Sequence, residues 1–171
     1  MWRSYYEYRR VRLASELVQL LRRQYHLPFW GSCIGAYHAA RAAAVFQVGH
    51  NRREYELALP DLVSYYALIR AHSEEAFDVE LTSRLELEWW IIHRERAHHS
   101  FDDLAHSLAV LQAGIYHQPD SAFAGHAAAR ANAMLLRDQR QEAGRVTEDD
   151  WARIGTMLDT SWTSLHGAVA R

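Results

Sequence analysis

The sequence FDVELTSRLELEWWIIHRERAHH, residues 77–99, combines large apolar side chains with closely spaced charged ones. Successive residues of an α-helix are rotated by about 100° about its axis. This rotation gives one face of the predicted helix five residues, namely Leu81, Leu85, Trp89, Ile92 and Arg96. Because a helix that is apolar on most sides is buried on most sides, we expect a buried central helix over about residues 74–99. Glu86 and His93 are expected on its one exposed stripe.

Helical periodicity continues on both sides of this segment, and no run of alternating β-branched residues predicts a strand. The other predicted helices cover about residues 4–25, 30–48, 61–72, 100–117, 121–143 and 147–169. Two of them begin with capping sequences, Ser100-Phe-Asp-Asp103 and Thr147-Glu-Asp-Asp150. A short helical turn over residues 51–59 is expected to end at Pro60. The predicted fold class is therefore all-α, a single domain over residues 1–171 built as a bundle of six to seven helices around the central one.

The composition bears on the origin and location of the protein. All 19 basic residues are arginine, which is typical of codon usage in a GC-rich bacterial genome, and the chain has one cysteine, Cys33. A lone thiol cannot form an internal disulfide and fits a reducing cytosol. The sequence lacks both an apolar stretch of membrane-spanning length and the features of a signal peptide. We therefore expect a bacterial cytoplasmic protein that does not contact a membrane.

Opposite charges are concentrated in different parts of the chain. Residues 1–53 carry nine arginines against two glutamates, whereas residues 54–103 carry four arginines against twelve acidic residues. A basic first third can bind nucleic acid, but no recognised binding motif accompanies it and the net charge is −2. We therefore do not expect a nucleic-acid partner, and we expect the two blocks to pair with each other across helix contacts.

These blocks contain charged residues on predicted apolar faces, where an unpaired ion is costly. The arginines expected in buried ion pairs are Arg10, Arg41 and Arg96. We expect Arg10 and Arg41 to meet Glu88 and Glu95 of the central helix.

A second interpretation of the same carboxylates is a metal site. Glu95-Arg-Ala-His98 resembles the Glu-x-x-His element of ferritin-like carboxylate proteins, in which two such elements and single glutamates hold a two-metal centre. The candidate metal ligands are Glu88, Glu95, His98, His99 and His38. The resemblance implies non-haem iron or manganese as the cofactor. The alternative for His98 and His99 is an interaction with the negative end of the helix dipole.

Aromatic residues form four sequence clusters, namely Trp2, Tyr5, Tyr6 and Tyr8; Phe29 and Trp30; Tyr65 and Tyr66; and Trp89 and Trp90. Core packing is the default role of such residues, whereas surplus exposed aromatic residues mark an interface. The chain has no phosphate-binding loop, no nucleophile elbow and no cysteine pair for zinc. The leading prediction is a non-catalytic binding or accessory protein that acts through a protein partner or through self-association. The alternative is a metal-binding bundle or a non-haem metal-dependent enzyme with a Glu/His site on the central helix.

Overall fold

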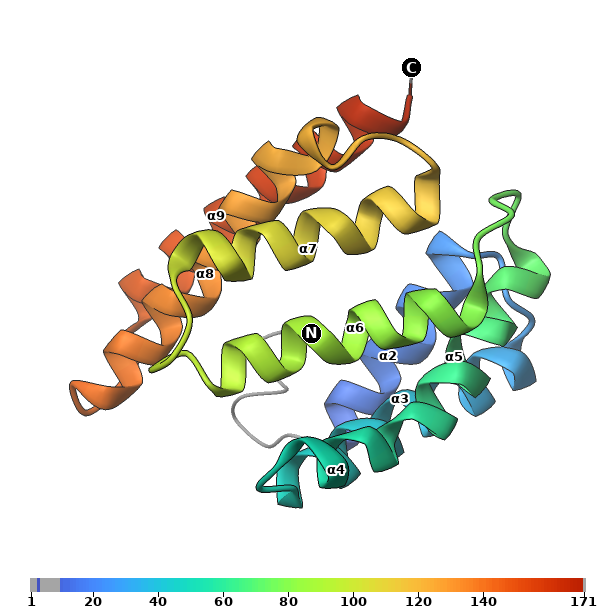
Figure 1. Ribbon diagram of the computed structural model, residues 1–171, viewed down its shortest axis with the longest axis horizontal. Coiled ribbons are helices and arrows are strands. Elements are labelled where there is room, and N and C mark those ends of the chain that lie inside the picture. The colour runs from blue at the N-terminus through green and yellow to red at the C-terminus, as the bar shows by residue number, and fades with distance from the viewer. Residues whose placement is uncertain (1–2, 4–9, 171) are drawn as a thin grey trace. The chain divides into compact units, whose positions relative to one another are not determined.

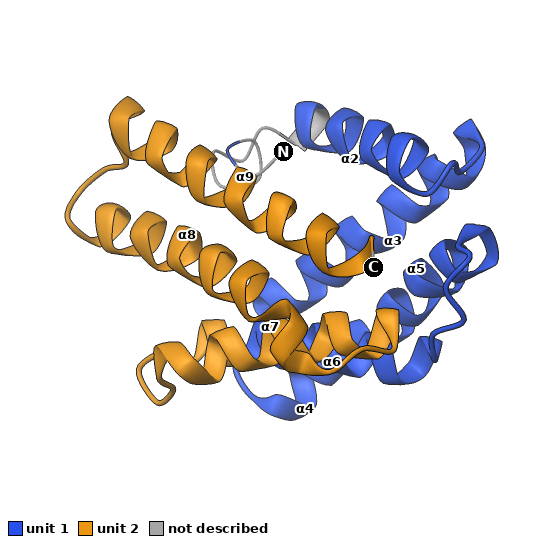
Figure 2. Ribbon diagram, turned by 90° about the horizontal axis from the view of Figure 1, so that it is seen from above, with its two compact units in different colours: residues 1–91 blue, residues 92–171 orange. Residues whose placement is uncertain are grey.

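The computed structural model describes residue 3 and residues 10–170, except for the side chains of residues 10 and 11 (Figure 1). All regular structure in this part of the chain is helical, which confirms the predicted all-α class. Seven of the described helices have 14 or more residues, in agreement with the predicted bundle. The chain divides into two compact units, Met1–Ile91 and Ile92–Arg171 (Figure 2), and the single domain over residues 1–171 stays a prediction.

Unit 1 is built around α3 (Phe29–Val48), which packs against both α2 (Arg10–Gln24) and α5 (Leu59–His72). Its other elements are the one-turn helix α4 (Arg52–Tyr55), the 3-10 turn η1 (Glu56–Ala58) and α6 (Val79–Arg94) as far as residue 91. Its hydrophobic core combines side chains of α3, α4, η1, α5 and α6, namely Ala42, Phe46, Tyr55, Ala58, Leu62, Leu87 and Ile91.

One face of α3 consists of small residues and one large aromatic residue, and it is buried. The residues of this face are Ser32, Gly35, Ala36, Ala42 and Phe46. At Gly35 an added Cβ would lie 3.0 Å from Cδ1 of the fully buried Leu21 of α2. Small side chains on this face therefore let α2 approach α3 closely, and the rotation of α3 about its axis is fixed by this contact.

Local signals define several ends of these helices. Pro28, in an extended conformation, precedes α3, and Asn51 caps α4 by accepting a hydrogen bond from the Glu54 amide at 3.1 Å. From the sequence, Pro60 was expected to end the preceding helical turn. In the structure Pro60 instead lies in the first turn of α5. A proline is tolerated there because the first amides of a helix have no partner within it.

The helix predicted over residues 74–99 is shorter in the structure, where α6 covers Val79–Arg94. At its start Asp78 Oδ1 accepts a hydrogen bond from the Leu81 amide at 2.9 Å. Residues 95–99 form a turn, in which the His98 amide donates to the Glu95 carbonyl oxygen at 2.8 Å. Because a capping box starts the next helix directly after Ser100, these residues serve as the connection.

The burial of α6 differs in part from the prediction, which expected the helix to be buried on most sides. Its buried residues are Thr82, Ser83, Leu87 and Ile91. Leu81, which the sequence placed on the main apolar face, is 50% exposed. Leu87 and Ile91 enter the core of unit 1, and this contact sets the rotation of the helix.

Unit 2 contains three long helices in which α8 (Ala124–Glu142) packs against both α7 (Phe101–Tyr116) and α9 (Glu148–Val169). The 3-10 turn η2 (Asp120–Phe123) connects α7 to α8. The capping boxes predicted at Ser100 and Thr147 are both confirmed. Gly144, with φ +117°, follows the end of α8 in a conformation that favours glycine. None of the described helices combines the length and the hydropathy needed to cross a bilayer.

A pair of leucine substitutions tests the core of unit 1. Leu62 is 2% exposed within the core, and Leu57 is 64% exposed. We expect Leu62→Ala to lower the free energy of unfolding by about 2–5 kcal/mol, because it removes buried methyl groups and leaves a cavity. Leu57→Ala should change it by less than about 0.5 kcal/mol. Urea denaturation followed by circular dichroism measures both, and equal effects would contradict the described core.

Candidate protein-binding surface

One side of α3 carries large apolar residues that are exposed in the described part of the chain. Trp30 is 75% exposed, Ile34 50%, Tyr37 58% and Val48 72%. Arg41 and Ala44, which are also exposed, complete a series in which the spacing alternates between four and three residues. An alternating spacing of four and three keeps side chains on one side of a helix. We call this set, Trp30, Ile34, Tyr37, Arg41, Ala44 and Val48, the α3 face.

The α3 face lies opposite the side of α3 that packs against α2 and α5. Single exposed apolar residues are ordinary on a protein surface, whereas a continuous apolar stripe marks a site of interaction. Two of the six positions of the face are aromatic and one is arginine. Tyrosine, tryptophan and arginine are the residue types most enriched at the centres of protein interfaces.

A buried carboxylate holds one polar side chain of the α3 face and one beside it. Asp61 of α5 is 4% exposed, and its two oxygens lie 2.9 Å from His38 Nδ1 and 3.2 Å from Arg41 Nε. The ring of Tyr37 contacts the ring of His38 edge to face, with 5.4 Å between the two centroids. Because Asp61 restrains Arg41, the guanidinium of this residue loses less conformational freedom when a partner binds.

The N-terminal end of the face continues into a basic region. The Phe29 ring lies edge to face on Trp30 at 5.3 Å, and the Arg22 guanidinium lies 5.9 Å from the Phe29 centroid. A hollow of about 490 Å³ adjoins Arg22 at the C-terminal end of α2. Its lining residues are Gln19, Arg22, Arg23, His26 and Leu27. This end of the surface is therefore basic, whereas the length of the face is apolar.

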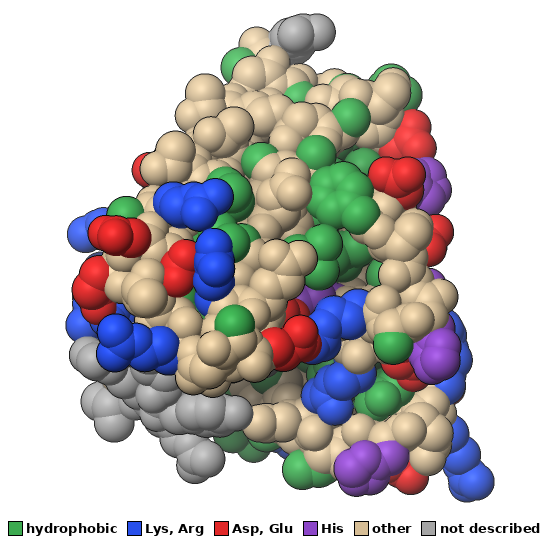
Figure 3. Space-filling model, turned by 90° about the vertical axis from the view of Figure 1, so that its left-hand side faces the viewer, with side chains coloured by type: hydrophobic (Ala, Val, Ile, Leu, Met, Phe, Trp, Pro, Cys, Tyr) green, Lys and Arg blue, Asp and Glu red, His purple; other side chains and the backbone are tan. Residues whose placement is uncertain are grey.

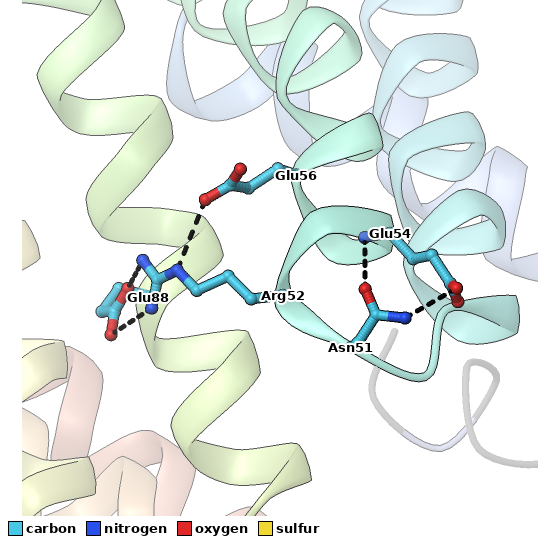
Figure 4. Close-up of polar contacts among 5 residues, drawn as sticks. All are labelled: Asn51, Arg52, Glu54, Glu56 and Glu88. Atoms are coloured by element: carbon cyan, nitrogen blue, oxygen red, sulfur yellow. Dashed lines mark hydrogen bonds and ion pairs between the residues drawn. The ribbon is translucent and has the colours of Figure 1, made fainter.

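The predicted metal ligands have other partners in the structure. Glu88 receives two hydrogen bonds from Arg52 of α4, at 2.7 and 3.3 Å, and Arg52 also contacts Glu56 (Figure 4). Beside this pair, Asn51 and Glu54 contact each other (Figure 4). His38 is held by Asp61.

Of the remaining predicted ligands, Glu95 and His98 lie in the turn after α6, so they do not share a helix face. His99 Nδ1 lies 3.9 Å from Asp103 Oδ2. Among the described residues, no three or more His, Cys, Asp or Glu side chains are grouped so that they could hold a metal ion. The geometry therefore gives no support to the predicted iron or manganese site.

The predicted arginines form ion pairs, but with other acids. Arg41 pairs with Asp61, and Arg96 pairs with Asp138 and Glu142, so neither meets Glu88 or Glu95. The side chains of Arg41 and Arg96 are 58% and 42% exposed, so the buried members of these pairs are the aspartates. The side chain of Arg10 lies outside the described residues. On the face shown in Figure 3, arginine side chains lie beside acidic ones.

Asp138 is the centre of the largest of these polar clusters, within unit 2. Its oxygens lie 2.9 Å from His93 Nε2 and 2.9 Å from an Arg137 nitrogen, and 3.8 Å from Arg96. Burial favours the neutral acid, but the contacts with His93 and Arg137 and the charge of Arg96 outweigh it. The pKa of Asp138 is therefore lowered. The sequence had placed His93 on an exposed stripe, and the structure pairs it with this carboxylate instead.

Glu86, the other residue expected on that stripe, accepts hydrogen bonds from Tyr66 Oη at 2.9 Å and from Trp90 Nε1 at 3.0 Å. Burial raises the pKa of Tyr66 well above its ordinary value, and the charge of Glu86 acts in the same direction. These contacts join α5 to α6, so two of the four aromatic clusters have structural roles. The cluster at Trp2, Tyr5, Tyr6 and Tyr8 lies outside the described residues.

Comparisons with protein-family models, with curated proteins and with solved structures find no match to this chain. The class of this protein is therefore described from its structure alone: it is an all-α protein with an exposed apolar helix face. Phe29 and Trp30 form one of the aromatic clusters of the sequence, whereas the exposure of Ile34, Tyr37 and Val48 was not predicted. The alternating spacing of four and three residues shows that these side chains share one side of the helix. It predicts their exposure only when the opposite side is known to be buried.

A buried histidine in unit 2 gives a pH-dependent prediction. His126 is 5% exposed, with Nδ1 2.8 Å from Ser161 Oγ. Burial lowers its pKa to about 4, and the charge of Arg130 acts in the same direction. The unfolded chain therefore binds a proton that the folded protein excludes, and stability is lost as the pH falls below about 6.5.

We expect His126 to remove about 2 kcal/mol of stability between pH 7 and pH 5. Denaturant unfolding of the protein and of His126→Gln at both pH values measures this contribution as the difference between their pH dependences. A loss of stability in the variant that is the same at both pH values does not affect this difference. An identical pH dependence in the two proteins would contradict a neutral buried His126.

Proposed function

We propose that this protein is a non-catalytic protein-binding module whose contact surface is the α3 face. The observation that carries the proposal is the continuous exposure of Trp30, Ile34, Tyr37 and Val48 along one helix. Leaving this much apolar area in water is unfavourable, and a partner that covers it gains hydrophobic stabilisation. The lone cysteine and the all-arginine composition lead us to place the module in the cytoplasm of a bacterium.

A protein partner fits this surface better than nucleic acid. A nucleic-acid surface needs arginines directed at phosphates. Here Arg12 pairs with Glu16, Arg41 with Asp61, and Arg52 with Glu56 and Glu88. Arg22 and Arg23 lie only at the N-terminal end of the surface. The α3 face has a single charged position among six. An apolar helix face of this kind is suited to packing against an apolar helix face of another protein.

Site-specific photo-crosslinking tests the proposal. A p-benzoylphenylalanine residue replaces Tyr37 in the protein expressed in its own cells, and irradiation links it to whatever covers the face. We expect one defined adduct, identified by mass spectrometry. The adduct should be lost when Ile34→Glu is added, because a charged side chain is costly to bury at an apolar contact.

The matched control places the same photo-reactive residue at Leu57, which is 64% exposed, compared with 58% for Tyr37, but lies outside the α3 face. It should not form this adduct. If Tyr37 gave no adduct, or if both positions gave the same set of adducts, the α3 face would not be a specific contact surface.

A further inference from the structure

We infer that the α3 face binds the same face of a second copy of this chain, with the two α3 helices antiparallel. This inference rests on the proposed function and names the partner of that surface. The argument starts from the spacing of the face. Six positions in steps of four, three, four, three and four residues form the pattern of a helix-pairing seam, in which each side chain fits between side chains of the facing helix.

The sizes of the side chains are self-complementary only in the antiparallel arrangement. A two-fold axis at the level of residue 39, midway along the sequence between Trp30 and Val48, places Trp30 opposite Val48 of the second copy. The same axis places Ile34 opposite Ala44. Trp30 and Ile34 of the N-terminal half therefore each meet a smaller residue of the C-terminal half. A parallel pair would instead place Trp30 against Trp30 and Ala44 against Ala44, which leaves crowding at one end and a gap at the other.

The charge on the face leads to the same orientation. Arg41 is the one charged position of the α3 face, and the antiparallel axis places it opposite the ring of Tyr37 of the second copy. A guanidinium over a tyrosine ring is an attractive contact. Asp61 balances the charge of Arg41 from within the same chain, at 3.2 Å, so both copies bring a matched pair to the seam. A parallel pair would face Arg41 with Arg41.

The size of the contact predicts a weak dimer. The 20 residues of α3 span about 30 Å. One helix pair of this length is at the small end of specific protein interfaces, in spite of four aromatic side chains between the two copies. We therefore expect a dissociation constant of about 1 µM or weaker, so that the protein is a monomer when dilute and a dimer when concentrated.

Sedimentation equilibrium of the purified full-length chain, over a range from about 1 to 300 µM, tests the association. The unchanged protein should pass from the mass of one chain to the mass of two. Ile34→Glu should weaken the association at least tenfold, because it places a carboxylate in the seam of each copy. Leu57→Glu, the same change at an exposed apolar residue outside the α3 face, should leave the association unchanged.

The orientation is tested by the distance between two spin labels in the dimer. The label is attached to the cysteine of a Gln47→Cys variant that also carries Cys33→Ala. Gln47 is exposed and lies near the C-terminal end of α3. The antiparallel pair separates the two Gln47 backbone positions by roughly 25 Å along the helix axes. A parallel pair brings them to roughly 10 Å. The short distance would overturn the antiparallel assignment.

The outcomes separate the pairing from the proposed function. If the purified chain stays a monomer at every concentration, or if Leu57→Glu weakens the dimer as much as Ile34→Glu, pairing through the α3 face is wrong. A defined crosslink from position 37 to another protein would then still uphold the binding function. If that crosslink is absent as well, both the pairing and the function fail.

Discussion

The close packing of α3 against α2 and α5 is the constraint on which the arrangement of unit 1 depends. Gly35 leaves room for the buried Leu21, and Phe46 fills the core beside Tyr55. These contacts fix the rotation of α3 about its axis. Because the helix has few polar residues, fixing its buried side leaves apolar side chains on the opposite side as well. The exposed α3 face is therefore a direct consequence of how the core of unit 1 is packed.

Buried carboxylates impose a second constraint. Asp61 and Asp138 are 4% and 6% exposed, and each is surrounded by cationic or hydrogen-bonding side chains. A buried carboxylate without such partners would be very costly, so the positions of the partners are determined by it. In unit 1 this has a functional consequence, because the partners of Asp61 include Arg41, which belongs to the α3 face. The core thus positions a polar group at the surface.

Much of the secondary structure could be predicted from the sequence because its signals are local. Ser100 and Thr147 cap helices through contacts within three residues, and both were found where the pattern placed them. The length of α6 was overestimated because the end of an amphipathic pattern does not mark the end of a helix. Burial was also expected at Leu81, which is exposed, since the choice between the faces of Leu81 and Leu87 is made by side chains distant in the sequence.

The helical class, the capped helix ends and the segregation of basic from acidic residues could all be predicted from the sequence, because they follow from periodicity and composition. Which acid pairs with which arginine, and which side of α3 stays in water, depends on tertiary packing. Glu88 pairs with Arg52, and Arg41 with Asp61. Both choices depend on the rotation of each helix about its axis, and that rotation is set by packing between segments far apart in the chain.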